Sequence, residues 1–226
     1  MTEITQVDEI KDQSNDFPAK EILVKVISPK AAFQIALALE EPNDELEQII
    51  ALSAEYSYEY AYKVLKGPFT LGEDIIATNE LFSLNYAKTI LKGRFHLADH
   101  LFIDNPGYAF TYAEVIKERF ELGEPIIASD PHYAFYYSRN ILKEPFPLGE
   151  AAIATEDRFA LSYAKEVLKG RFELGEDVIK QNSRLYHQYK QFVNDFEEER
   201  QVQSITNNSG LSKEQLEALA AVLVPA

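Results

Sequence analysis

Apolar and polar residues follow one another along this chain in a pattern that returns about every 26 residues. Each copy has a central tyrosine, a small residue directly after it, and a β-branched residue four positions after it. Apolar residues at these intervals have helical spacing, so each copy predicts a helix of about three turns. The central tyrosines are Tyr60, Tyr86, Tyr112, Tyr137 and Tyr163.

A phenylalanine closes each copy, within the phrase KGPF, KGRF, KERF or KEPF. These residues are Phe69, Phe95, Phe120, Phe146 and Phe172, at intervals of 26, 25, 26 and 26 residues. The third copy lacks the leucine that follows the β-branched residue in the others, and this deletion predicts a local kink at residues 116–120. The phrase L-G-E, once L-A-D, then opens a second helix of about two turns.

Polar residues and glycines mark the expected ends of the long helices. The N-cap positions hold residue types whose side-chain oxygen can accept an orphan backbone N–H, namely Ser53, Asn79, Asn105, Asp130 and Asn182. The expected C-terminal markers are glycines in the left-handed conformation, Gly67, Gly93 and Gly170. The acid of each L-G-E phrase suits the positive end of the following helix dipole.

A fixed period of this length is typical of stacked helix pairs rather than of a closed core. We therefore predict an all-α fold, an α-solenoid of about five clear 26-residue helix-pair repeats with degenerate terminal caps. The repeat domain is expected at 19–200, with the clear repeats at 54–182. Residues 1–18 are acidic and predicted to be disordered, and residues 201–210 read as a linker. A capping box at Ser212–Gln215 opens an amphipathic helix in 211–226, which either caps the solenoid or serves self-association or partner docking.

The 226 residues carry a net charge of −15, and the pI is near 4.7. Such a chain is not expected to bind nucleic acid directly, because phosphate binding needs a positive surface. There is no cysteine, which excludes disulfides and thiolate chemistry. No apolar run approaches the ~18 residues of a membrane helix, and the N-terminus lacks a signal-peptide pattern. These features predict a cytoplasmic protein without membrane contact.

Motifs that carry catalytic chemistry are missing from the sequence. It contains no Walker A phrase, no GxGxxG and no GxSxG. His96 and His100 are four residues apart, but they occur in one repeat only and lack the HExxH arrangement. We therefore expect no catalytic residue, no cofactor and no metal, and predict that the protein is not an enzyme.

Three phrases carry a resemblance, YAKTILKGRF (86–95), YAEVIKERFELGE (112–124) and YAKEVLKGRFELGE (163–176). They resemble the short two-helix "YAxxVLKGRFxxGE" repeat arrays of tailed bacteriophages and large DNA viruses. The resemblance covers about residues 41–182. It implies an α-solenoid and a viral origin, and such an origin implies interaction with a host protein in the host cytoplasm.

The leading hypothesis is a non-catalytic protein-binding scaffold, which with a viral origin would bind and neutralise a host factor. One alternative is a structural or assembly protein that self-associates through its C-terminal helix. Another is an acidic nucleic-acid mimic that binds a DNA-binding host protein. The candidate contact residues are two tyrosines that are not among the central tyrosines, and four arginines. They are Tyr62, Arg94, Arg119, Tyr136, Arg139 and Arg171.

Overall fold

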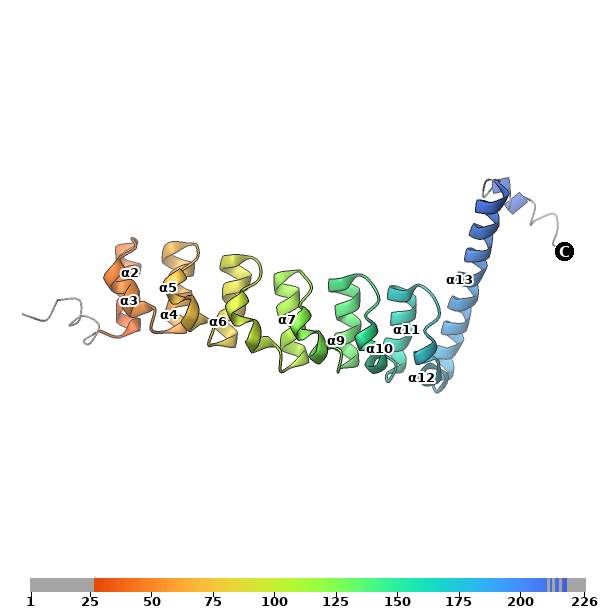
Figure 1. Cartoon of the computed structure of the whole chain (residues 1–226), viewed down its shortest axis with the longest axis horizontal. Coiled ribbons are helices and arrows are strands. Elements are labelled where there is room, and N and C mark those ends of the chain that lie inside the picture. Colours follow the sequence, from red (N-terminus) through yellow and green to blue (C-terminus); the bar gives the residue numbers. More distant parts are fainter. Residues whose placement is uncertain (1–26, 211, 213, 216, 219–226) are drawn as a thin grey trace, which may run out of the picture. The chain divides into compact units, whose positions relative to one another are not determined.

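The computed structural model describes residues 27–210, 212, 214, 215, 217 and 218, and these residues form helices and turns without a strand. The all-α prediction is therefore confirmed for this part of the chain. The chain divides into two compact units, Met1–Phe102 and Ile103–Ala226. In each unit, long and short helices alternate along the chain (Figure 1).

In the first unit, two of the long helices end in a π-helical turn, and the final short helix is a 3-10 helix. The elements are α2 (Pro29–Leu39), α3 (Asp44–Ile50), α4 (Ala54–Tyr60) with η1 (Ala61–Leu65), α5 (Thr70–Ile76), α6 (Glu80–Tyr86) with η2 (Ala87–Leu91), and η3 (His96–Phe102).

The second unit continues the alternation and ends in the long helix α13 (Ser183–Ser209). Its other long helices are α7 (Pro106–Ile116), α9 (Pro131–Tyr136) with η5 (Tyr137–Leu142), and α11 (Asp157–Tyr163) with η6 (Ala164–Leu168). Its short helices are η4 (Glu121–Gly123) with α8 (Glu124–Ile127), α10 (Pro147–Ile153), and η7 (Glu173–Gly175) with α12 (Glu176–Lys180).

The core of both units consists of the residues that define the sequence repeat. All five central tyrosines have no exposed surface, and the five closing phenylalanines are at most 3 % exposed. Each tyrosine contacts the phenylalanine of its own copy, with ring centroids 5.0 Å apart for Tyr163 and Phe172. Burial of rings of this size is the main source of stability in such a core. The predicted helix face is therefore confirmed.

The long helices end differently from the prediction. In all five copies the left-handed residue is a lysine with φ between 49° and 58°, and in three copies it stands one position before the expected glycine. These lysines are Lys66, Lys92, Lys117, Lys143 and Lys169. Gly67, Gly93 and Gly170 do not have positive φ. The N–H groups of both Lys66 and Gly67 point to the carbonyl of Ala61, so the reversal is complete before the glycine.

The missing leucine of the third copy removes a π-turn and does not distort the phrase that follows. In the copies of full length, the last helical turn is π-helical, which accommodates one extra residue. In the short copy, α7 remains α-helical to its end, and the Lys117 N–H donates to the Ala113 carbonyl at 2.9 Å. Lys117 keeps the left-handed conformation, and Phe120 stays buried. The deletion is therefore absorbed inside the helix, and a kink of the repeat array at 116–120 stays a prediction.

The C-terminal part of the chain corrects one predicted boundary. Residues 201–209, expected to be a linker, continue α13, and Gly210 ends the helix with φ 69°. The prediction rested on the Asn and Ser content of this segment. These residues disfavour the helical conformation only weakly, so a long helix can continue through them. The capping box is confirmed, since the Ser212 N–H donates to Gln215 and the Gln215 N–H donates to Ser212. The predictions for 1–18, and most of the predicted helix at 211–226, lie outside the described residues.

Candidate protein-binding face

The buried hydroxyls of Tyr86, Tyr137, Tyr163 and Tyr189 each join their helix to the preceding copy of the same unit. The Tyr163 hydroxyl accepts the Phe146 N–H at 2.8 Å and donates to the Glu150 carboxylate at 2.9 Å. Burial raises the pKa of Tyr163 well above its ordinary value, and the bond to Glu150 raises it further. The same pair of bonds recurs for Tyr86 with Phe69 and Glu73, Tyr137 with Phe120 and Glu124, and Tyr189 with Phe172 and Glu176.

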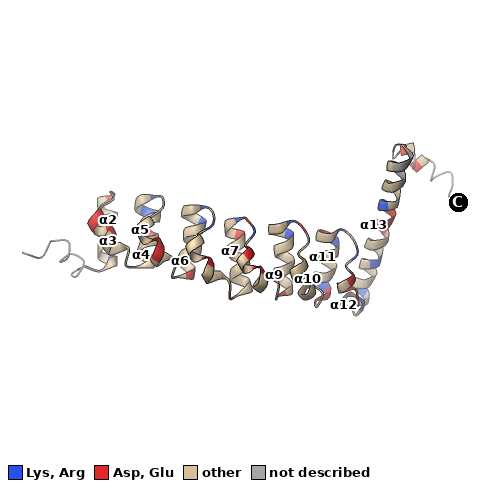
Figure 2. Ribbon diagram, in the orientation of Figure 1, with Lys and Arg blue, Asp and Glu red and all other residues tan. Residues whose placement is uncertain are grey.

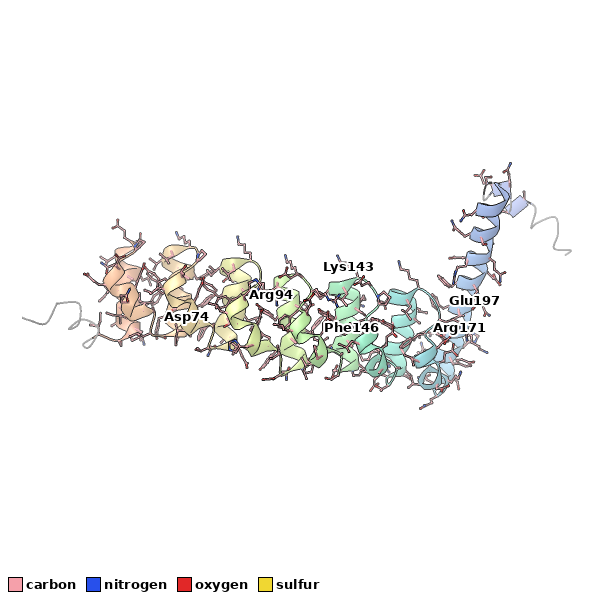
Figure 3. All side chains as sticks on the ribbon, viewed as in Figure 1. Asp74, Arg94, Lys143, Phe146, Arg171 and Glu197 are labelled. Atoms are coloured by element: carbon pink, nitrogen blue, oxygen red, sulfur yellow. The ribbon has the colours of Figure 1, made fainter. Side chains whose placement is uncertain are left out.

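All four predicted contact arginines form ion pairs inside the chain. Three of them pair with the acid of their own L-G-E or L-A-D phrase, five residues later. The pairs are Arg94–Asp99 at 2.8 Å, Arg119–Glu124 at 2.7 Å and Arg171–Glu176 at 2.8 Å. Figure 3 labels Arg171 near the start of α13. The side chains of Arg119 and Arg171 are nevertheless 51 % and 53 % exposed, whereas that of Arg94 is 21 % exposed.

The same acids also have an internal role that the helix-dipole reading did not anticipate. Asp99 and Glu124 are buried, and Glu150 receives the tyrosine hydroxyl described above. A mimic of nucleic-acid phosphates needs its charges on the surface, where a partner can reach them. This arrangement therefore does not favour the acidic-mimic hypothesis.

In the first unit, Tyr62 lies on the surface, as a contact residue should. About half of its surface is exposed, 51 %. Its ring stacks on Tyr58 at a centroid distance of 6.0 Å. It is an exposed aromatic residue supported by a single neighbouring ring.

In the second unit, the structure brings two predicted residues together. The Arg139 guanidinium carbon lies 4.6 Å from the centroid of the Tyr136 ring, and Arg139 Nη1 lies 3.0 Å from the Glu166 carboxylate. The His132 ring lies 4.7 Å from Tyr136 and 5.6 Å from Phe159. We refer to His132, Tyr136, Arg139, Phe159 and Glu166 as the aromatic–arginine cluster.

The cluster combines exposure with fixed geometry. The side chains of Arg139 and Glu166 are 37 % and 44 % exposed, and Tyr136 is half-buried. Arginine and tyrosine are the residues most often found at the energetic centres of protein interfaces. Because Arg139 is already held by a ring and a carboxylate, little side-chain entropy remains to be lost when a partner binds.

Sequence reasoning missed the bonds that join each tyrosine to an acid of the preceding copy. The signal was present, since the tyrosine follows its acid by 13 residues at Glu73–Tyr86, Glu124–Tyr137 and Glu150–Tyr163. A pair that recurs at constant spacing in every copy is a candidate contact between neighbours.

Comparison with known proteins adds no further constraint, since no protein-family model, curated protein or solved structure matches this chain. Within the described residues, no group of three or more His, Cys, Asp or Glu side chains could hold a metal ion. None of the described helices is long and apolar enough to cross a membrane.

Proposed function

We propose that this chain is an α-solenoid that acts as a non-catalytic protein-binding scaffold, with the aromatic–arginine cluster as its main contact surface. Repeats with one fixed set of internal bonds present a rigid surface, and a rigid surface loses little entropy on binding. The observation that carries the proposal is the partly exposed Arg139, held between Tyr136 and Glu166. The narrower prediction from the phage-array resemblance is that the partner is a host factor.

The test is affinity capture from bacterial lysate, followed by rebinding of the purified captured protein. We expect the double variant Tyr136→Ala/Arg139→Ala to lose that protein while its helical circular dichroism is unchanged. The matched control is Tyr186→Ala/Lys190→Ala, which removes another tyrosine–cation pair, 5.0 Å apart, with the same change in charge. The control should retain the partner.

Two results would contradict the proposal. One is equal capture by both double variants, which would place the contact elsewhere. The other is an absence of any stoichiometric partner together with a higher oligomer in solution that dissociates when residues 211–226 are deleted. That result would favour the self-assembling structural protein instead.

A further inference from the structure

Two arginines of the second unit have no partner within the described part of the chain. Four of the seven arginines in the sequence form ion pairs, and Arg200 lies 5.9 Å from the Phe196 ring. The remaining two, Arg158 and Arg184, are exposed and form no hydrogen bond, ion pair or ring contact with the described residues. Both line the same groove.

This groove lies between α11 and α13 and has a volume of about 410 Å³. Its polar lining groups are a hydroxyl and two amides, and two leucines supply apolar surface. The lining residues besides the two arginines are Leu161, Ser162, Asn182, Leu185 and Gln188. The groove therefore combines two guanidinium groups, further hydrogen-bonding groups and some apolar surface.

The two arginines do not belong to the framework of the repeat. They occupy equivalent positions in successive copies, five residues before Tyr163 and Tyr189. The other copies have no arginine at this position, where they carry Glu55, Leu81, Gly107 and His132. Two like charges in neighbouring copies repel each other, so folding alone gives no reason for the pair. An anionic ligand would remove this repulsion.

The lining of the groove contains two arginines and no acid. One acid lies beside it, since Asp157 on α11 accepts a hydrogen bond from Asn182 at 2.9 Å, and Asp157 lines a neighbouring pocket together with Glu156. Further along η6, Lys165 adds a positive charge, 5.9 Å from the Phe192 ring on α13. The groove is thus a local basic site on a strongly acidic chain.

We propose that the groove between α11 and α13 binds an acidic peptide segment of a partner protein, with Arg158 and Arg184 holding its carboxylates. Arginine binds carboxylate through two parallel hydrogen bonds, and the half-buried Leu185 contacts apolar side chains of the same segment. Nucleic acid fits less well, because the net charge is −15 and no aromatic ring lines the groove for base stacking. The inference rests on the proposed binding function and names the chemistry of the partner.

The experiment measures fluorescence polarisation of a fluorescein-labelled peptide of alternating glutamate and leucine with the full-length protein. Wild-type protein should bind it, and should bind the glutamine–leucine version at least tenfold more weakly. Arg158→Gln/Arg184→Gln should weaken binding of the glutamate peptide at least tenfold, and Arg158→Lys/Arg184→Lys should restore part of it. The matched control is Lys143→Gln/Lys169→Gln, which removes two exposed charges outside the groove and should stay within twofold of wild type.

Three outcomes overturn the proposal. They are equal binding of the glutamate and glutamine peptides, equal weakening by the lysine control, and tighter binding of a ten-residue oligothymidylate than of the glutamate peptide. The Tyr136→Ala/Arg139→Ala protein separates this inference from the proposed function. This variant should still bind the glutamate peptide but lose the partner. Partner capture that persists in this variant contradicts only the role of the cluster, and wild-type protein that captures its partner but does not bind the glutamate peptide contradicts only the role of the groove.

Discussion

The central tyrosines Tyr86, Tyr137 and Tyr163 contribute more than a ring, because the hydroxyl of each makes two bonds inside the core. The Tyr163 ring has no exposed surface, yet its hydroxyl satisfies the Phe146 N–H and the Glu150 carboxylate. Buried polar groups without partners destabilise the folded state. A phenylalanine at this position would therefore keep the ring packing but leave the Phe146 N–H and the Glu150 carboxylate without the hydroxyl. The same residue therefore contributes to packing and to the contact between copies.

Tyr163→Phe should lower the free energy of unfolding by about 1–3 kcal/mol, because it leaves a buried N–H and a partly buried carboxylate without a partner. Urea denaturation followed by circular dichroism measures the loss. Tyr186→Phe is the matched control, since Tyr186 is not among the central tyrosines and its hydroxyl forms no hydrogen bond with the described residues. Equal stability of the two variants would show that the hydroxyl bonds contribute nothing.

Alkaline pH should unfold the protein cooperatively. Burial raises the pKa of four central tyrosines and of Tyr189 in the folded state. The four are Tyr60, Tyr86, Tyr137 and Tyr163. In the unfolded chain a tyrosine loses its proton near pH 10, so above that pH the unfolded state binds fewer protons than the folded state. Stability is therefore complete below about pH 10 and falls as the pH rises beyond it.

Absorbance at 295 nm, recorded together with circular dichroism, tests this dependence. These five tyrosines should ionise only as the helical signal is lost, after the exposed tyrosines have titrated. Ionisation of all the tyrosines near pH 10 with full retention of helix would contradict the burial of these hydroxyls.

The long helix tolerates a one-residue difference in length because its final turn has two alternative forms. An α-helical end serves the 25-residue copy, where α7 stops at Ile116, and a π-helical end such as η2 serves the 26-residue copies. Both forms lead into a left-handed lysine, so the closing phenylalanine reaches the core in either case. The backbone reversal, and not the helix length, is the constant feature.

Insertion of a leucine between Ile116 and Lys117 should therefore create a π-turn and change the free energy of unfolding by less than about 1 kcal/mol. The matched control is the same insertion after Phe110, which rotates Tyr112 out of the core and should cost about 3–5 kcal/mol. Chemical denaturation of both proteins gives the comparison. A large loss from the first insertion would contradict the proposed equivalence of the two helix ends.

Within the second unit, each long helix is stabilised mainly by its contacts with the long helices directly before and after it in the chain. The long helices make contacts in the order α7 with α9, α9 with α11, and α11 with α13. The hydroxyl of Tyr189 on α13 binds the Phe172 N–H and Glu176. In such an arrangement, damage at one copy weakens its neighbours more than distant copies.

Tyr189→Ala should consequently raise amide hydrogen exchange most strongly in α12 and α11, and least in α7. Mass spectrometry of proteolytic fragments resolves these segments. A uniform rise across Ile103–Ala226 would mean that the second unit unfolds as one body and would argue against a solenoid.

The repeat length, the helical class and the buried ring positions follow from the amino-acid sequence alone. Periodic apolar residues report which side of a helix is buried, whatever that helix packs against. Cap residues act over three positions, so local pattern also identified Asn79, Asn105 and Asp130 as true N-caps.

Packing between copies decided two of the remaining features, the bond from Tyr163 to Glu150 and the shared groove of Arg158 and Arg184. For the first, the sequence contains only the constant spacing of the two residues. The ion pair of Arg171, the pairing of Tyr136 with Arg139 and the π-helical turns lie within one copy, where the backbone and side-chain conformation decides which of several possible neighbours is reached. Distance along the chain determines local geometry, whereas contact across a repeat boundary requires the three-dimensional stacking of the helices.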